Sequence, residues 1–294
     1  MKDNHKTVAE IIPPPPFHMV GDGFRVHNFF PSLPVPGLHG MSPFFLMDYN
    51  SKWLLSPSER QRGVGVHPHR GFETVTIAFH GKIAHHDSAG NSGIIGEGDV
   101  QWMTAGEGVL HKEYHEKEFS REGGIFQMVQ LWVNLPAKFK MTPAKYQAIE
   151  NKDMGKIILP KNQGIIDIIA GEYNGIKGPA FTFSPMNMFN ARLNKNGQAD
   201  FSFPETFNTG ILIVEGEVRI NNTVIAPEDN FIYFGKKGTD ISMEALKNST
   251  ILILSGEPIN EPIASYGPFV MNTDDELRKA YEDFHSGKFG YLED

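Results

Sequence analysis

Two short pairs of side chains in the first half of the chain could bind a metal ion. His67 and His69 form an H-x-H pair, and His111 and Glu113 form an H-x-E pair. In an extended strand, side chains two residues apart point to the same face. Two such strands that face one interior would therefore supply three imidazoles and one carboxylate. This donor set leaves coordination positions open for water, O2 or a substrate.

Glu73 is a second candidate carboxylate. It alternates with Thr74 and Thr76 in a strand-like run, and it has the same parity as the two histidines of the first pair. If one strand runs from His67 through Phe79, Glu73 faces the same interior as the histidines. Glu73 could then bind the metal, accept a hydrogen bond from a ligand imidazole or face other polar groups. We favour the hydrogen bond to an imidazole over direct coordination.

The remaining polar side chains of this region have simpler expected roles. His85 and His86 are adjacent, so at most one of them faces the interior, and structural or solvated roles are favoured for both. His115 continues the parity of His111 and could be a spare ligand. Arg70 is expected to form an ion pair with Glu73 or with another acid.

The chain has no cysteine, so a metal here must be held by nitrogen and oxygen ligands. Three imidazoles and a carboxylate with open positions are consistent with Fe(II) and O2 chemistry. The same set is also consistent with Mn, Ni, Cu or Zn, because affinity alone does not select among these ions. Disulfide bonds and cysteine nucleophiles are excluded.

The elements around these residues read as short strands separated by glycine turns. Residues 65–115 alternate strand-like runs with Gly-rich segments, which is typical of antiparallel strands in a small barrel or sandwich. Residues 124–135, GIFQMVQLWVNL, form a strand that is at least half apolar on both faces, and this favours burial between layers. The pattern predicts an all-β fold.

The second half repeats this pattern of strands and turns without the candidate metal ligands. Residues 209–234 have the same strand, glycine, strand, turn and strand rhythm as the metal-ligand segment, and residues 141–270 contain no histidine. We therefore predict a duplicated β fold, with a metal-binding domain at 1–150 and a metal-free domain at 151–294. Strand candidates of the second half extend from Lys156–Leu159 to Thr250–Ser255 and include Phe181–Phe183.

One helix is expected, near the end of the chain. Asn272 or Thr273 can cap it, and acidic residues follow in its first turn. An apolar stripe with helical spacing would dock it, and Gly287 can end it. The stripe consists of Leu277, Ala280, Tyr281 and Phe284.

Composition limits the function classes. The formal net charge is −8, the pI is near 5.8, and no block of Lys and Arg is present, which argues against a nucleic-acid-binding surface. No run approaches the roughly 18 apolar residues of a membrane span, and the N-terminus lacks the apolar core of a signal peptide. We therefore expect a cytoplasmic protein with no membrane contact.

Three motifs, in order, resemble the pirin family of the cupin superfamily. They are HPHRGFETVT, GDVQWMTAGEGVLHKE and GEPINEPIASYGPFVMNTDDEL, and the resemblance extends from about Asp48 to Phe289. It implies a bicupin, with two jelly-roll-like β-barrels, the first with a metal and the second usually without. It also implies a mononuclear iron site at His67, His69, His111 and Glu113.

The resemblance further implies that Glu73 is not a metal ligand, although many other cupins use a glutamate at that position. The family usually has an arginine after the TAG turn, where this chain has Glu107. An acid in place of a base changes the charge near the entrance and bears on substrate preference.

Members of the family are associated with quercetin 2,3-dioxygenase activity, in which O2 opens the central ring of a flavonol with loss of CO. The resemblance therefore implies a small aromatic, flavonol-like substrate, whose 3-hydroxyl would lose its proton to Glu113 or Glu73. Other members act as iron-dependent partners of transcription regulators or bind metabolic enzymes. A non-enzymatic iron or redox sensor that regulates a protein partner is thus the alternative.

Overall fold

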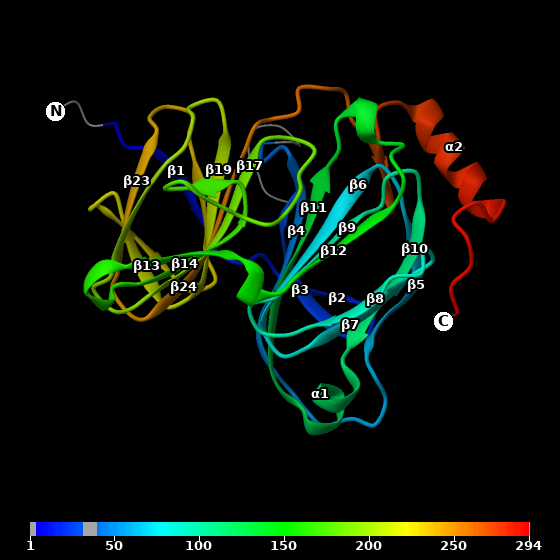
Figure 1. Cartoon of the computed structure of the whole chain (residues 1–294), viewed down its shortest axis with the longest axis horizontal. Helices are drawn as coiled ribbons and strands as arrows, with labels where there is room; N and C mark the ends of the chain where they lie inside the picture. The colour runs from blue at the N-terminus through cyan, green and yellow to red at the C-terminus, as the bar shows by residue number, and fades with distance from the viewer. Residues whose placement is uncertain (1–3, 32–39, 294) are drawn as a thin grey trace. The chain divides into compact units, whose positions relative to one another are not determined.

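The computed structural model describes residues 4–31 and 40–293, which form two compact units. The first unit contains Pro16–Leu33, Pro43–Asn151 and Ile259–Asp294. The second unit contains Met1–Pro15, Pro34–Ser42 and Lys152–Pro258. Each unit is built on a seven-stranded and a four-stranded antiparallel sheet, so the all-β bicupin fold is confirmed (Figure 1).

The strands and helices of the first unit are β2 (His18–Val20), β3 (Phe24–Phe30), β4 (Phe44–Leu55), β5 (Gly63–His69), β6 (Phe72–His80), β7 (Ile83–Asp87), β8 (Ser92–Ile95), β9 (Val100–Thr104), β10 (Val109–His115), α1 (Lys117–Glu122), β11 (Gly124–Asn134), a 3-10 turn at Ala137–Phe139, β12 (Lys145–Ile149), β25 (Ala264–Tyr266), β26 (Phe269–Met271) and α2 (Asp274–His285). Its larger sheet has the order β12-β9-β6-β11-β4-β3-β2, and its smaller sheet has the order β5-β10-β7-β8. A further 3-10 turn, Asn151–Asp153, lies where the chain passes to the second unit.

The elements of the second unit are β1 (Val8–Ile12), β13 (Gly155–Leu159), a 3-10 turn at Pro160–Asn162, β14 (Gly164–Ala170), β15 (Glu172–Tyr173), β16 (Ile176–Lys177), β17 (Met186–Leu193), β18 (Gln198–Ser202), β19 (Asn208–Glu215), β20 (Glu217–Ile220), β21 (Val224–Pro227), β22 (Phe231–Phe234), β23 (Asp240–Ala245) and β24 (Ser249–Gly256). Its larger sheet has the order β1-β22-β19-β24-β17-β14-β13, and its smaller sheet has the order β18-β23-β20-β21.

The two ends of the chain are exchanged between the units, which differs from the contiguous division predicted at residue 150. Strand β1 pairs with β22 of the second unit, and Ile259–Asp294 belongs to the first unit. The pairing of β1 with β22 satisfies backbone hydrogen-bonding groups, and the C-terminal segment buries apolar side chains. Neither contact can be predicted from the local sequence pattern. Residues 43–151 belong to the first unit and residues 152–258 to the second.

The interior of the second unit is apolar. Ile168, Phe189, Ile213, Val218 and Ile253 belong to one buried cluster that fills the space between its sheets. Among the residues that the structure describes, the one group of three or more potential metal ligands lies in the first unit.

The predicted C-terminal helix is α2. Thr273 caps it, and the Glu276 side chain accepts a hydrogen bond from the backbone N–H of Thr273, which completes a capping box. Helix α2 packs beside β25 and β26 in the first unit. The short helix α1 was not predicted, although the Glu116 side chain caps its first turn.

The strand predicted at Phe181–Phe183 is wrong, because these residues lie outside the strands. Pro179 and Pro185 flank the segment and remove backbone donors that a ladder would use.

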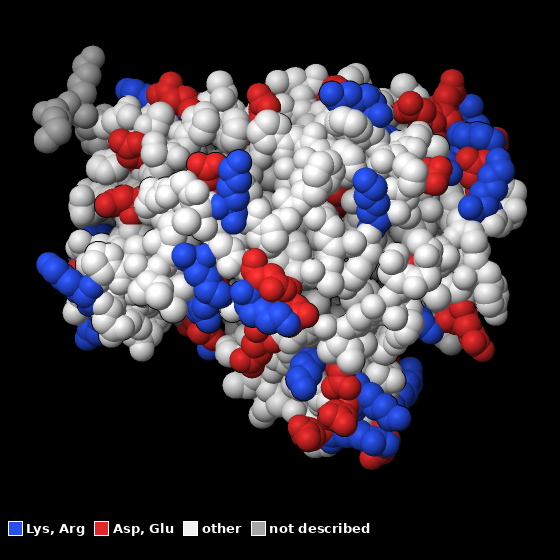
Figure 2. Space-filling view, viewed as in Figure 1, with Lys and Arg blue, Asp and Glu red and all other residues white. Residues whose placement is uncertain are grey.

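No helix in the described part of the chain is long and apolar enough to cross a membrane. On the face shown in Figure 2, basic and acidic side chains are interspersed.

Candidate metal centre

The two predicted ligand pairs lie on neighbouring strands of the smaller sheet in the first unit. His67 and His69 end β5, and His111 and Glu113 lie in β10. Strands β5 and β10 are antiparallel, with His111 directly opposite His67 and Val109 opposite His69. Directly opposite residues of a ladder share a face, so the register brings the three imidazoles together.

The histidines form a compact cluster. Each can offer one ring nitrogen such that these atoms all lie within 4.8 Å of one another. The ring centroids of His67 and His111 are 4.2 Å apart, and those of His69 and His111 are 4.7 Å apart. His69 and His111 are buried, whereas His67 is half-buried, so the cluster lies just inside the barrel.

Backbone carbonyl groups orient two of the rings. Nδ1 of His67 lies 2.8 Å from the Gly65 carbonyl oxygen, and Nδ1 of His69 lies 3.3 Å from that of Pro268. A proton on each Nδ1 leaves Nε2 with a free lone pair, which is the usual arrangement around a bound metal. Neither ring nitrogen of His111 has a hydrogen-bond partner among the described residues. A buried, unpartnered imidazole is costly unless something binds it, and a metal ion would.

Burial keeps these imidazoles neutral. It lowers the pKa of His69 and of His111 well below the usual value, and the neighbouring His67 lowers both further. A neutral imidazole is the form that binds a metal. The donor set therefore fits a first-row divalent ion.

Glu113 is buried next to the cluster and joins the two sheets of the barrel. Its carboxylate accepts hydrogen bonds from Thr76 Oγ1 on β6 at 3.1 Å and from Gln130 Nε2 on β11 at 2.7 Å. Burial raises the pKa of Glu113, while the hydrogen bond from Gln130 and the nearby His67 oppose this effect. Glu113 is not one of the residues whose ligand atoms all lie within 4.8 Å of one another.

Glu73 does not share the face of the histidines, contrary to the prediction. The chain turns at Arg70 and Gly71, where Gly71 has a φ of 85°, so β5 and β6 belong to different sheets. The register of β6 with β9 is regular from Glu73 to Ile77, and Thr76 faces Glu113. Strand alternation therefore places Glu73 on the opposite face.

On that face, Glu73 accepts a hydrogen bond from Thr104 Oγ1 at 2.7 Å, and burial raises its pKa to about 7. Its position excludes the role of base at the histidine cluster.

His115 is a structural residue rather than a spare ligand. Its Nε2 donates to the Gly23 carbonyl oxygen at 2.9 Å, and its ring packs edge-on against Phe24. His86 also has a structural partner, the Tyr114 hydroxyl, at 2.6 Å.

Arg70 forms its ion pair with Asp283 of α2, not with Glu73. The distance from Nη1 to Oδ2 is 2.9 Å, and both side chains are buried. Arg70 Nε also donates to the Glu107 carbonyl oxygen at 2.6 Å, while the Glu107 side chain is exposed. The residue next to His69 thus connects β5 with the C-terminal helix.

Sequence reasoning missed the residues that hold Glu113 and the corner after His69. Thr76 and Gln130 hold Glu113, and the available signal was a glutamine between the apolar Val129 and Leu131. Lys140 is buried and donates to the carbonyl oxygens of Gly71 and Val270 at 2.8 and 2.7 Å. No local pattern around Lys140 predicts these contacts, because Val270 is far away in the sequence.

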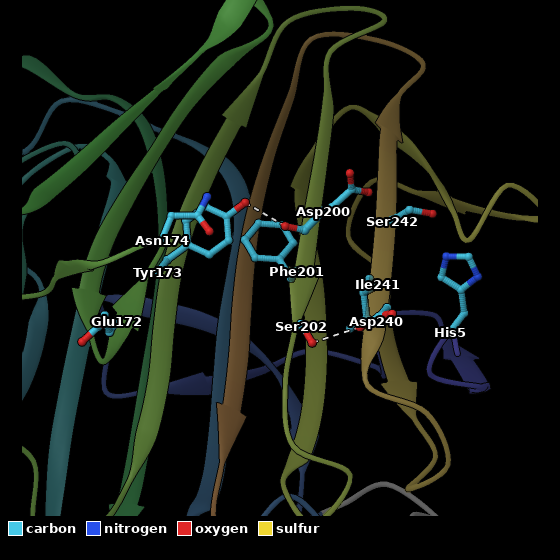
Figure 3. A pocket seen from close by; sticks show the side chains of 10 residues that line it. All are labelled: His5, Glu172, Tyr173, Asn174, Asp200, Phe201, Ser202, Asp240, Ile241 and Ser242. Carbon is cyan, nitrogen blue, oxygen red and sulfur yellow. Dashed lines mark hydrogen bonds between the residues drawn. The ribbon is translucent and has the colours of Figure 1, made fainter. Parts of the chain in front are cut away.

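A hollow of about 430 Å³ lies on the second unit (Figure 3). Tyr173 donates to the Asp200 carbonyl oxygen at 2.7 Å across it, and Ser202 donates to Asp240 at 2.9 Å. Two of the polar side chains that line the hollow are therefore bound to neighbours in its wall.

Comparisons with known proteins identify relatives of the whole chain. A family model described as Pirin matches residues 23–133, and one described as Pirin C-terminal cupin domain matches residues 188–290. A protein of Pseudomonas aeruginosa with the provisional name of a quercetin 2,3-dioxygenase is 42% identical over 92% of this chain and 94% of its own length. Pirin of Homo sapiens is 33% identical over 92% and 90% of the two chains.

A crystal structure of quercetin 2,3-dioxygenase from Acinetobacter baumannii has the same fold, with a TM-score of 0.92. The two chains are 46% identical, and the match covers 98% of this chain and 99% of the other.

Proposed function

The chain belongs to the pirin family of cupin proteins, and from that premise we propose that it is an Fe(II)-dependent dioxygenase that opens the central ring of a quercetin-type flavonol. The observation that carries the proposal is the cluster of three imidazoles inside the first barrel, beside a buried carboxylate. The 46% identity with a protein described as quercetin 2,3-dioxygenase supports the choice of substrate.

In this proposal His67, His69, His111 and Glu113 hold the metal. Three neutral nitrogen donors and one carboxylate leave a divalent ion with a net positive charge and open positions. When bound, the ion would act as a Lewis acid toward the flavonol 3-hydroxyl and would bring the substrate and O2 together. Mn, Ni, Cu and Zn fit the same donors, so the choice of iron is part of the proposal.

Glu113 is the group proposed to take the proton from the 3-hydroxyl. Thr76 and Gln130 hold its carboxylate in a fixed orientation beside the histidine cluster. In the overall reaction both oxygen atoms of O2 enter the product, and one ring carbon leaves as CO.

The proposal is tested by adding quercetin and air to protein that was loaded anaerobically with Fe(II). Loss of the flavonol absorption together with release of one CO per flavonol is the expected result. Parallel samples loaded with Mn, Ni, Cu or Zn rank the metals. If no divalent metal supports turnover, the dioxygenase proposal is wrong.

A metal-dependent regulator of a protein partner is the second candidate, and two contacts favour it. The Pro268 carbonyl oxygen contacts ligand His69, and Arg70 next to it binds Asp283 of the surface helix α2. A change at the metal could therefore reach the surface of the first unit. A partner that binds the Fe(II) and Fe(III) forms with different affinities would support this candidate.

A further inference from the structure

Two rows of side chains face each other inside the first barrel, next to the metal centre. In the smaller sheet, Glu113 of β10 lies opposite His85 of β7, which lies opposite Gly93 of β8. Directly paired residues share a face, so His85 points into the barrel together with Glu113. Strands β7 and β10 thus form one wall and β6, β9 and β12 belong to the other (Figure 1).

The other wall contributes a matching row. Gln130 of β11 lies opposite Thr76 of β6, which lies opposite Gln101 of β9. Thr76 and Gln130 both bind Glu113, so this face also points inward. Gln101 is therefore an interior residue, one strand further from Glu113 than Thr76.

His85 and Gln101 are buried polar residues without partners. Each is only 1% exposed, and neither the two ring nitrogens of His85 nor the two amide atoms of Gln101 have a hydrogen-bond partner in the described part of the chain. The large majority of buried side-chain polar atoms have a partner, and an unsatisfied one costs about 1–3 kcal/mol. Four unpaired polar atoms beside the histidine cluster indicate a place where a polar ligand binds.

The residues around His85 hold its ring inside the barrel. Its ring packs on the Tyr146 ring, with centroids 4.8 Å apart. A Cβ atom at Gly93 would lie 3.0 Å from Cε1 of His85 and 3.1 Å from the Tyr146 hydroxyl, so any side chain at this position would crowd both rings. A glycine here leaves space for the pair.

The chemistry of these groups selects a class of ligand. A neutral imidazole and a primary amide each present a donor and an acceptor. Burial lowers the pKa of His85 to about 4, so its ring is neutral at physiological pH. The buried cations Arg70 and Lys140 are already bound to other groups. Neutral donor and acceptor pairs fit hydroxyl groups, which also donate and accept, better than carboxylates or phosphates.

We propose that His85 and Gln101 form a substrate subsite that binds the hydroxyl groups of an aromatic ring, whose reacting portion lies at the metal. This inference rests on the proposed function for the identity of the aromatic compound. It assigns a specificity role to two residues that lie outside the ligand set.

The test measures equilibrium binding of two flavonols to the Fe(II)-loaded protein without oxygen. Quercetin and 3-hydroxyflavone share the 3-hydroxyl and the neighbouring carbonyl, and only quercetin has further hydroxyl groups. We expect the wild type to bind quercetin roughly tenfold more tightly, as for one or two additional hydrogen bonds. In Gln101→Met the ratio of the two Kd values falls toward one, while the Kd of 3-hydroxyflavone stays within about twofold.

His85→Asn is the second variant, and a fall in the same ratio is expected. His86→Asn is the matched control, because His86 lies on the other face of β7, bound to Tyr114, and should leave the ratio unchanged. The thermal midpoint of metal-free Gln101→Met should stay equal or rise, since an unpartnered polar group is removed.

An unchanged Kd ratio in both variants would overturn the subsite. A large fall in the midpoint of Gln101→Met with an unchanged ratio would show that ordered water binds these groups for structural reasons, which also overturns it. Turnover in air is recorded separately. Selective binding that depends on Gln101 without ring opening keeps the subsite and rejects the dioxygenase, whereas ring opening with an unchanged ratio does the reverse.

Discussion

At the residue scale, the metal site depends on alternation within two strands. The i, i+2 spacing of His67 with His69 and of His111 with Glu113 was sufficient to predict which histidines meet, because the register of β5 and β10 preserves that parity. The same rule failed for Glu73, because the chain changes sheets at Gly71. The alternation of side chains between two faces holds only within one uninterrupted strand.

Replacement of His111 by alanine should remove most of the bound metal. His111 is the most central imidazole of the cluster, with its ring close to those of both His67 and His69. The fold should persist, because the ring has no hydrogen-bond partner among the described residues. Metal content is measured by elemental analysis and the fold by circular dichroism. His86→Ala is the control, and wild-type occupancy in His111→Ala would refute the assignment.

Glu73→Gln should stabilise the metal-free protein at pH 8 and have little effect at pH 5. The pKa of Glu73 is raised from 4.5 to about 7, chiefly by burial. The stability linked to its protonated form is present below about pH 4.5 and is lost as the pH rises through about 7. Glutamine keeps the acceptor for Thr104 without a buried charge.

The gain at pH 8 should be about 1–3 kcal/mol, measured by urea unfolding at both pH values. An equal gain at pH 5 and pH 8 would contradict the raised pKa.

At the scale of elements, local patterns predicted more than long-range contacts. The cap at Thr273 and the apolar stripe were enough to predict α2. What α2 packs on was not predictable, because Arg70 and Asp283 lie 213 residues apart. The turn at Gly71 was equally unpredictable, because its hydrogen-bond partners are distant in the sequence. The Gly71 N–H donates to the Gly106 carbonyl oxygen, and the Gly71 carbonyl oxygen accepts from Lys140.

Asp283→Ala should loosen α2 and weaken metal binding. Asp283 accepts hydrogen bonds from Arg70 and Lys288 and pairs with Lys279, so its removal leaves the Arg70 guanidinium buried without its partner. We expect a loss of about 1–3 kcal/mol in unfolding free energy and faster hydrogen exchange in α2. Metal affinity should fall a few fold, because Arg70 follows His69.

Asp275→Ala is the matched control on the same helix. Asp275 pairs with Arg278 at the surface, and both side chains are exposed. The unfolding free energy should change by less than about 0.5 kcal/mol. Equal losses for the two aspartates would mean that the contact with Arg70 contributes nothing specific.

At the scale of the whole molecule, the duplication of the β fold followed from the repeated sequence pattern. The absence of histidine between residues 141 and 270 and the apolar strands there agree with the apolar interior of the second unit. The exchange of the chain ends did not follow, because β1 has no local partner and joins β22 more than 200 residues away. Tertiary pairing of this kind leaves no periodic signal.

Metal loading should raise the thermal midpoint of the first unit. A hundredfold excess of metal over Kd contributes about 2.7 kcal/mol, or roughly 5–10 °C for a unit of this size. The gain should vanish at acidic pH, when protons compete for the imidazoles. Because the pKa values of His69 and His111 are lowered, this loss should have its midpoint below pH 6.5. Scanning calorimetry across pH checks it, and His111→Ala should show no gain.

The most direct test of the account is the position of the metal in a crystal of iron-loaded protein, from anomalous scattering at the iron edge. We predict one strong peak in the first barrel, at bonding distances of about 2.0–2.3 Å from a nitrogen of His67, His69 and His111 and from an oxygen of Glu113. A peak bound by other residues, or no peak at this cluster in protein shown to contain iron, would contradict the account.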